Sequence, residues 1–248
     1  MFQDLGEILL LFLATLRSLP RAWRERRKVF EQLFEIGNAS LLMACILSLF
    51  IGGVLSLQTG PVLVQRGLGS SLGGLVGLAV CKELAPVMMS ILIAGRIGSA
   101  MAAELGSMKV YQEIDALHTM NINPVHYLVL PRVLAITLAL PCLVIFSNLV
   151  GWFGGALVSA GNQEVGVSFS AFFGNLRDVV RPWDITHGLL KSVLFAVVTG
   201  VVACHQGLTT VGGPRGIGRS VTKAVVNSLV LILILDYIFT RLLLPFDR

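Results

Sequence analysis

The chain has 248 residues, of which 55% are hydrophobic and only 13% are charged, and its mean hydropathy is +0.82. A water-soluble globular domain rarely has this composition, which is typical of a membrane protein. The formal net charge is +5, and each of the four cysteines lies within an apolar run, with no Cys-x-x-Cys pair. We therefore expect no disulfide framework, no metal site and no bound cofactor.

The first 36 residues are amphipathic and too short in apolar length to cross a bilayer. The segment "EILLLFLATLRSLP" leads into "RAWRERRKVF", where Trp23 stands among Arg21, Arg24, Arg26, Arg27 and Lys28. This pattern is typical of a helix in the headgroup region of an anionic leaflet. A solvated basic linker is the alternative. A cleaved signal peptide is not expected, because the charges follow the apolar run.

Five apolar runs follow, and each is long enough to cross a hydrocarbon core of about 30 Å, which takes roughly 20 helical residues. They cover residues 37–65, 72–105, 128–160, 185–206 and 221–244. We expect an all-α, polytopic membrane protein with one domain of residues 1–248. Residues 1–36 would form its interfacial helix, and residues 37–248 its five-span region.

Small residues four apart in these runs favour close helix packing. The pairs are Gly73 with Gly77, Gly95 with Ser99, and Gly151 with Gly155. They suggest a tight helix bundle or a dimer without specifying which helices meet.

The distribution of Lys and Arg predicts the orientation, because short cytoplasmic loops carry an excess of them. With the N-terminus in the cytoplasm, that side holds eleven such residues and the opposite side five. We expect a periplasmic C-terminus. The short amphipathic stretch "SFSAFFGNLRDVVRPW" before the fourth span would lie on the far side.

The second run contains charges at a depth where ionisable groups are costly unless they are paired or solvated. Lys82 and Glu83 precede Pro86, and Arg96 follows further along the same run. At about 100° per residue, Lys82 and Arg96 share one helix face and Glu83 points to the side. The alternatives are an interhelical ion pair with a structural role and a polar site that meets a lipid headgroup.

The segment "YQEIDALHTMNINP", between the second and third runs, is polar and is predicted to lie in the cytoplasm. Ile114, Leu117 and Met120 recur every three residues, and Glu113 and Asp115 flank them. The proline that ends the segment stops the helix before the third span. Such a helix could anchor in a groove of a partner protein. The alternative is a loop helix that packs on its own bundle.

Two motifs match enzyme patterns only in part. "GPRGIGRS" has the glycine spacing of a P-loop, but Arg219 stands in place of the lysine and no soluble strand precedes it. "GSSLG", which begins at Gly69, lacks the strand-to-helix context of a nucleophile elbow. No catalytic residue is predicted.

The segment from Lys82 to Arg132, "KELAPVMMSILIAGRIGSAMAAELGSMKVYQEIDALHTMNINPVHYLVLPR", resembles the signature region of the MlaE (YrbE-type) family of ABC-transporter permeases. The resemblance continues through "GWFGG", "KSVLFA" and "VGGPRGIGRSVTKAVVNS". Many members have Arg at the position of Lys82. Lysine retains the charge there but lacks the bidentate geometry of arginine.

The resemblance implies a homodimeric permease in a bacterial inner membrane, bound to two cytoplasmic ABC ATPase subunits. It also implies a periplasmic hexamer of MCE-domain proteins and a small STAS-domain protein. The expected substrate is a phospholipid moved between inner and outer membranes. The resemblance places Lys82 and Glu83 beside the lipid pocket. Lys82, Glu83 and Arg96 together form our predicted headgroup site. The resemblance also makes the helix from Tyr111 to Met120 the ATPase coupling element.

We therefore expect a transporter subunit that is not itself an enzyme, with ATP hydrolysed by a separate chain and with no nucleic-acid partner. The alternatives are a secondary carrier and an intramembrane enzyme. Five spans cannot be halved into the repeats that are typical of carriers, and an enzyme would need a nucleophile and base that the sequence does not reveal. Recovery of an ATPase with the purified chain would distinguish the three.

Overall fold

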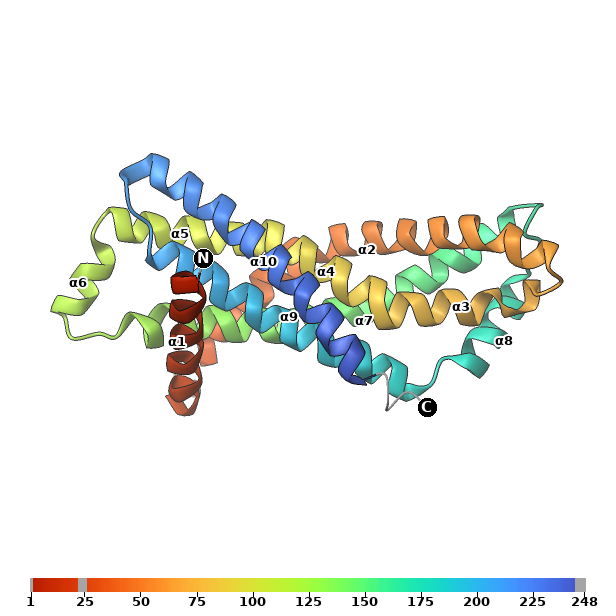
Figure 1. The fold of residues 1–248 in the computed structure, drawn as a ribbon, viewed down its shortest axis with the longest axis horizontal. Coiled ribbons are helices and arrows are strands. Elements are labelled where there is room, and N and C mark those ends of the chain that lie inside the picture. Colours follow the sequence, from red (N-terminus) through yellow and green to blue (C-terminus); the bar gives the residue numbers. More distant parts are fainter. Residues whose placement is uncertain (1, 22–25, 244–248) are drawn as a thin grey trace. The chain divides into compact units, whose positions relative to one another are not determined.

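A computed structural model describes residues 2–21 and 26–243, and all regular secondary structure in this part of the chain is helical (Figure 1). The α-helices are α1 (Phe2–Ser18), α2 (Arg26–Gln65), α3 (Leu72–Ala79), α4 (Ala85–Ile93), α5 (Ser99–Val110), α6 (Glu113–Thr119), α7 (Leu130–Gly161), α8 (Phe169–Val179), α9 (Pro182–Leu208) and α10 (Gly213–Leu243). Two 3₁₀ turns, η1 (Leu19–Arg21) and η2 (Gly69–Ser71), and three π-helical turns, η3 (Val80–Leu84), η4 (Ala94–Gly98) and η5 (Val125–Val129), complete the order. The predicted all-α class is confirmed.

Five continuous helical stretches within the described residues are long and apolar enough to cross a membrane. They are Arg26–Gln65, Gly69–Val110, Val125–Gly161, Pro182–Leu208 and Gly213–Leu243. Each overlaps one predicted run and begins before it, because the helix already includes the residues that precede the run. The chain is therefore a multi-pass membrane protein with the five predicted candidate spans.

The N-terminal region is divided where we expected one interfacial helix. α1 ends two residues before Pro20, since the residue before a proline disfavours helical geometry. The basic residues from Arg26 onward open α2, and the Nζ atom of Lys28 lies 3.4 Å from the centroid of the Tyr127 ring. These basic residues thus belong to the first spanning helix. Two other residues of the predicted headgroup motif, Trp23 and Arg24, lie outside the described residues.

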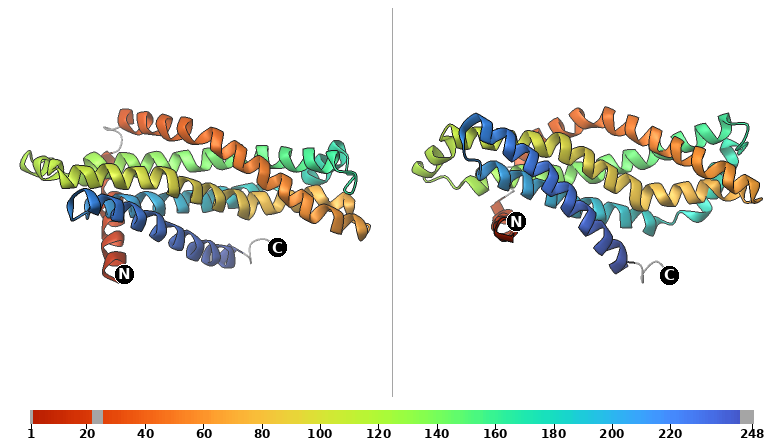
Figure 2. Two further views of the ribbon diagram at one scale, coloured as in Figure 1. Left: turned by 90° about the horizontal axis from the view of Figure 1, so that it is seen from above. Right: turned by 45° about the horizontal axis from the view of Figure 1, so that its top comes forward.

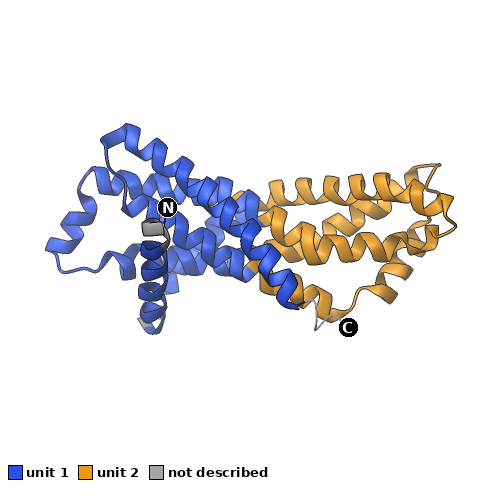
Figure 3. Cartoon of the chain, viewed as in Figure 1, with its two compact units in different colours: residues 1–38, 90–140, 193–248 blue, residues 39–89, 141–192 orange. Residues whose placement is uncertain are grey.

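The chain forms two compact units, coloured separately in Figure 3. Unit 1 contains residues 1–38, 90–140 and 193–248, and unit 2 contains residues 39–89 and 141–192. The helices α2, α4, α7 and α9 each contribute residues to both units. We describe each unit by itself.

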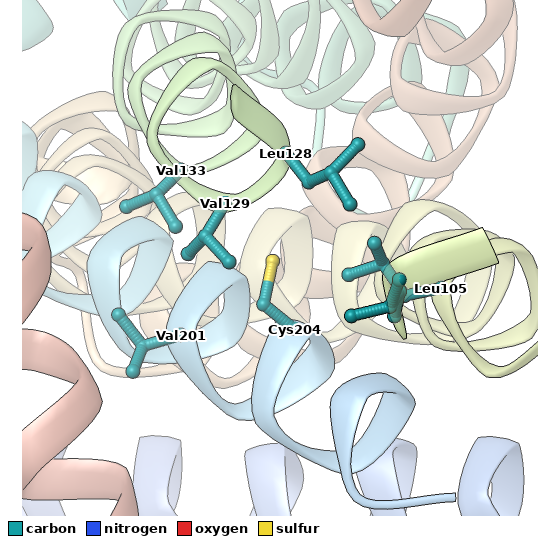
Figure 4. Packing of buried hydrophobic residues seen from close by; sticks show 7 residues of the cluster. Leu105, Leu128, Val129, Val133, Val201 and Cys204 are labelled. Atoms are coloured by element: carbon teal, nitrogen blue, oxygen red, sulfur yellow. The ribbon is translucent and has the colours of Figure 1, made fainter. Parts of the chain in front are cut away.

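Unit 1 has a core built where α5, η5 and α9 meet. Leu105, Val129, Val133, Val201 and Cys204 are buried there together, as Figure 4 shows. α10 runs beside α5, and α1 packs near η5 while crossing the direction of the neighbouring helices in Figures 1 and 2. On α1, Ile8, Leu11 and Phe12 pack against the core. The α1 helix therefore has one face fixed to unit 1.

Unit 2 is held by close helix contacts at small residues. A Cβ atom added to Gly73 of α3 would meet the carbonyl of Phe172 in α8, and one added to Gly52 of α2 would meet the carbonyl of Gly151 in α7. Two of the three predicted small-residue pairs therefore mark close packing. At the third, a Cβ atom added to Gly95 would meet nothing within 4 Å. The predicted amphipathic stretch before the fourth span is helix α8, whose Phe172 is buried.

Candidate functional site

Two ion pairs join the charges of the second span to the fourth span within unit 2. The Nζ atom of Lys82 lies 2.8 Å from Oδ1 of Asp184, and the Nζ atom of Lys191 lies 2.7 Å from Oε2 of Glu83. Lys82 and Glu83 come from the π-helical turn η3, and their partners come from α9. Each of the two adjacent charges on η3 is thus matched by an opposite charge.

The four side chains differ in their exposure to the surroundings. The Lys191 side chain is 0% exposed and the Asp184 side chain 9%, whereas Lys82 is 22% and Glu83 40% exposed. Asp184 also accepts a hydrogen bond of 2.8 Å from the backbone N–H of Arg181. The partners on α9 are therefore fixed inside unit 2, and the η3 residues form the accessible side of the cluster.

The packing of α9 against η3 explains why both pairs form. Asp184, Gly188 and Lys191 are spaced by four and three residues, so they share one face of α9. A Cβ atom at Gly188 would collide with the carbonyl of Cys81, so the two backbones touch there. Asp184, one turn before Gly188, then reaches Lys82, and Lys191, one turn after it, reaches Glu83.

The turn η3 itself departs from α-helical geometry. The backbone N–H of Ala85 donates to the carbonyl of Val80, five residues earlier, and the next residue is Pro86, which has no N–H to donate. π-helical turns of this kind occur often at functional sites. The turn also changes the angular phase of the residues that follow it.

Unit 2 also contains an apolar groove of about 350 Å³, to which η3 contributes one lining residue. Six of its seven lining residues are apolar, and the seventh is Gln58; the lining is Leu47, Phe50, Ile51, Val54, Leu55, Gln58 and Leu84. Leu84 directly follows Glu83 in η3. The groove has the shape and chemistry to hold a hydrocarbon chain, while the neighbouring charges could meet a polar head.

Arg96, the third residue of the predicted headgroup site, is assigned to the other unit. Arg96 belongs to η4 in unit 1, whereas Lys82 and Glu83 belong to unit 2, so the three form no single cluster within either unit. The prediction assumed 100° per residue along the whole run. Lys82 and Arg96 lie in the π-helical turns η3 and η4, where the angle per residue differs from 100°, so the shared helix face of Lys82 and Arg96 stays a prediction.

The predicted coupling segment forms helix α6 in unit 1, which ends at Thr119, before Pro124 as expected. Ile114 is 4% exposed and belongs to the core of unit 1, and Leu117 packs against that core. These two residues do not lie on the exposed surface that we expected. Met120 is 61% exposed.

The charged residues of this segment are exposed as well. Glu113 and Asp115 lie on the surface of α6, and Oδ1 of Asp115 lies 2.9 Å from Nζ of Lys109. A partner could therefore meet the acids and Met120, while Ile114 and Leu117 fix α6 to its own bundle.

Asp184 and Lys191 were missed by the sequence analysis. Their signal was present, since Asp184 directly precedes the fourth apolar run, Lys191 lies within it, and the two are seven residues apart. No group of three or more His, Cys, Asp or Glu side chains suited to a metal ion occurs among the residues that the structure covers.

Comparison with known proteins identifies the family to which this chain is similar. The model of the permease MlaE family matches residues 29–242. A "Probable ABC transporter permease protein" of Synechocystis is 38% identical over 88% of this chain and 82% of its own length. The "Intermembrane phospholipid transport system permease protein MlaE" of Haemophilus influenzae is 33% identical over 98% of this chain and 92% of its own.

A plant protein is similar as well. "TRIGALACTOSYLDIACYLGLYCEROL 1, chloroplastic" of Arabidopsis thaliana is 40% identical over 86% of this chain, which covers 61% of the plant protein. The family match spans all five candidate membrane helices and both elements of the charged cluster. The chain therefore belongs to the MlaE family of permeases.

Proposed function

We propose that this chain is the membrane-spanning subunit of an ATP-driven ABC transporter that moves phospholipids between the inner and outer membranes of a bacterium. It would act as a homodimer, with ATP hydrolysed by a separate cytoplasmic chain. The names of the Synechocystis and Haemophilus relatives support the transporter class and the phospholipid substrate. The observation that carries the proposal is that η3, in a chain of this family, contributes two residues to ion pairs and a third, Leu84, to an apolar groove.

A phospholipid has two chemically different parts, and unit 2 offers a surface for each. The groove lined by α2 and Leu84 suits an acyl chain, because burial of hydrocarbon needs no polar partner. Lys82 is partly exposed and can donate to a lipid phosphate as well as to Asp184. Glu83 holds the buried charge of Lys191, so the cluster stays balanced while lipid enters and leaves.

Helix α6 is our candidate for contact with the ATPase. Its exposed residues Glu113, Asp115 and Met120 offer two acids and one flexible apolar side chain, a combination suited to a protein interface. Ile114, buried in the core of unit 1, would carry a displacement of α6 into that unit. The proposed orientation has the N-terminus and α6 in the cytoplasm and the C-terminus in the periplasm.

A direct test combines affinity purification with reconstitution. The tagged chain should recover an ABC ATPase, and vesicles containing both should transfer labelled phospholipid only when ATP is hydrolysed. A Lys82→Gln variant should retain the ATPase and lose transfer. Transfer without ATP would favour a secondary carrier, and turnover of a lipid would favour an enzyme. Either result would contradict the proposal.

The proposed additional partners are a periplasmic MCE-domain hexamer and a STAS-domain protein bound to the ATPase. Mass spectrometry of the same purified complex would detect both. Their absence from a complex that still transfers lipid would remove them from the proposal and leave the permease function in place.

A further inference from the structure

A second cavity, of about 370 Å³, lies wholly within unit 1. It is formed by α1, the end of α9 and the start of α10, and its lining consists of Glu7, His205, Gln206, Thr209, Val211, Gly216, Arg219, Ser220, Lys223 and Asn227. Val211 is the one large aliphatic side chain in this lining. Hydroxyl, amide and charged groups dominate, which is the opposite of the groove in unit 2.

The charges of this cavity favour an anion. Arg219 and Lys223 are four residues apart on α10, so both face the cavity from one side of the helix. Neither makes an ion pair with another side chain in the described part of the protein. Ser220 and Asn227 add donors on the same helix.

The single acid of the lining is already engaged. Oε2 of Glu7 lies 3.0 Å from Nε2 of His205, whose side chain is 7% exposed. This contact occupies the Glu7 carboxyl group. The contact also fixes α1 to the end of α9. Two cations therefore face the cavity, against one acid that is bound to histidine.

The position of the cavity indicates where the anion would come from. The end of α9 packs on the end of α5, because a Cβ atom at Gly207 would lie 2.6 Å from Cβ of Leu105. Helix α6 follows α5 directly, so the cavity and α6 lie at the same end of unit 1. This is the end at which spans meet the membrane surface, since α9 ends and α10 begins there.

Helix α1 lines this cavity through Glu7 and also carries an exposed apolar face. It crosses the direction of its neighbouring helices (Figures 1 and 2), as a helix in the membrane plane would. Its outer face exposes four leucines, which are Leu9, Leu10, Leu13 and Leu16. A lipid beside α1 would place its acyl chains along these leucines and its headgroup at the level of Glu7.

We propose that the cavity between α1, α9 and α10 binds a phosphate oxyanion at the membrane surface, with Arg219 and Lys223 as its cationic ligands. The lipid-facing leucines of α1 favour the phosphate of an anionic phospholipid over free phosphate as the source. This site is separate from the groove of unit 2, and it does not depend on transport or on an ATPase.

The test uses the purified full-length permease in detergent and measures its thermal unfolding midpoint. Phosphatidylglycerol should raise the midpoint, because a ligand that binds only the folded state stabilises it, and phosphatidylcholine should raise it less. In the Arg219→Gln/Lys223→Gln variant the phosphatidylglycerol concentration needed for the same shift should rise roughly tenfold or more, since charged hydrogen bonds are lost. A parallel titration with inorganic phosphate tests whether free phosphate also raises the unfolding midpoint.

The matched control is Arg215→Gln/Arg241→Gln, which removes the same charge from exposed positions of α10 outside the cavity lining. It should respond to phosphatidylglycerol as the unaltered protein does. The charge-preserving Arg219→Lys/Lys223→Arg variant should do so as well, and it guards against a folding defect. A response to inorganic phosphate alone that requires Arg219 and Lys223 would assign the same site to free phosphate. Equal responses of both double glutamine variants, or no response to either anion, would overturn the proposal.

Discussion

The ammonium group of Lys191 lies 2.7 Å from the carboxylate of Glu83, and the two side chains differ sharply in exposure, at 0% and 40%. The lysine is thus fixed inside unit 2, while the acid can meet lipid or solvent. Removal of the acid would take the Glu83 carboxylate away from a buried ammonium group, whereas removal of both side chains would leave no ammonium group there. This asymmetry separates the structural role of the pair from its proposed role in transport.

Replacing Glu83 by Gln should destabilise the protein by about 3–5 kcal/mol, the range for breaking one side of a buried ion pair. The double variant Glu83→Leu/Lys191→Met should recover most of that loss, because neither charge of this pair remains. Thermal unfolding in detergent measures both. We expect the double variant to fold and still fail in lipid transfer; normal transfer by it would assign the pair a purely structural role.

Replacing Gly188 by Ala should weaken both ion pairs at once, because the added methyl group would collide with the carbonyl of Cys81 and separate α9 from η3. Overpacking of this kind costs about 1–3 kcal/mol. The matched control is Gly174→Ala in α8, where a Cβ atom would meet nothing within 4 Å. That change should be neutral or stabilise by about 0.5–1 kcal/mol. Similar unfolding midpoints for the two variants would contradict the close contact at Gly188.

Substitutions on α6 should separate folding from partner binding. Ile114→Ala should cost about 2–5 kcal/mol of stability, since Ile114 lies in the core of unit 1. Met120→Glu should leave the unfolding midpoint within about 0.5 kcal/mol, because exposed positions tolerate change, and should reduce ATPase recovery. Full recovery of the ATPase by Met120→Glu would remove α6 from the proposed interface.

Single-cysteine labelling should establish the orientation of the spans. In a background without the four native cysteines, Lys109→Cys should react with a membrane-impermeant reagent only from the cytoplasmic side, and Asn175→Cys only from the periplasmic side. The prediction depends on the excess of Lys and Arg in the cytoplasmic loops. Labelling of Lys109→Cys from outside would reverse the orientation and move α6 away from any cytoplasmic ATPase.

The five spans and the all-α class were predictable from the sequence, because the length and hydropathy of a run are local properties. The end of α6 before Pro124 and the helix around Phe172 were predictable for the same reason, since proline geometry and amphipathic spacing act over a few residues. Lys82 and Glu83 stood out by their cost at membrane depth. Their family context came from motif resemblance.

The partners of these charges were decided by the tertiary structure. Lys191 is 108 residues from Glu83 in the chain, and the two meet only because Gly188 lets α9 touch η3. The π-helical turns η3 and η4 broke the constant angle on which the predicted polar stripe depended. The burial of Ile114 was also decided by the tertiary structure. An apolar residue at every third position indicates that one helix face is shielded from water. The neighbouring helices determine whether that face packs on its own core or binds another protein.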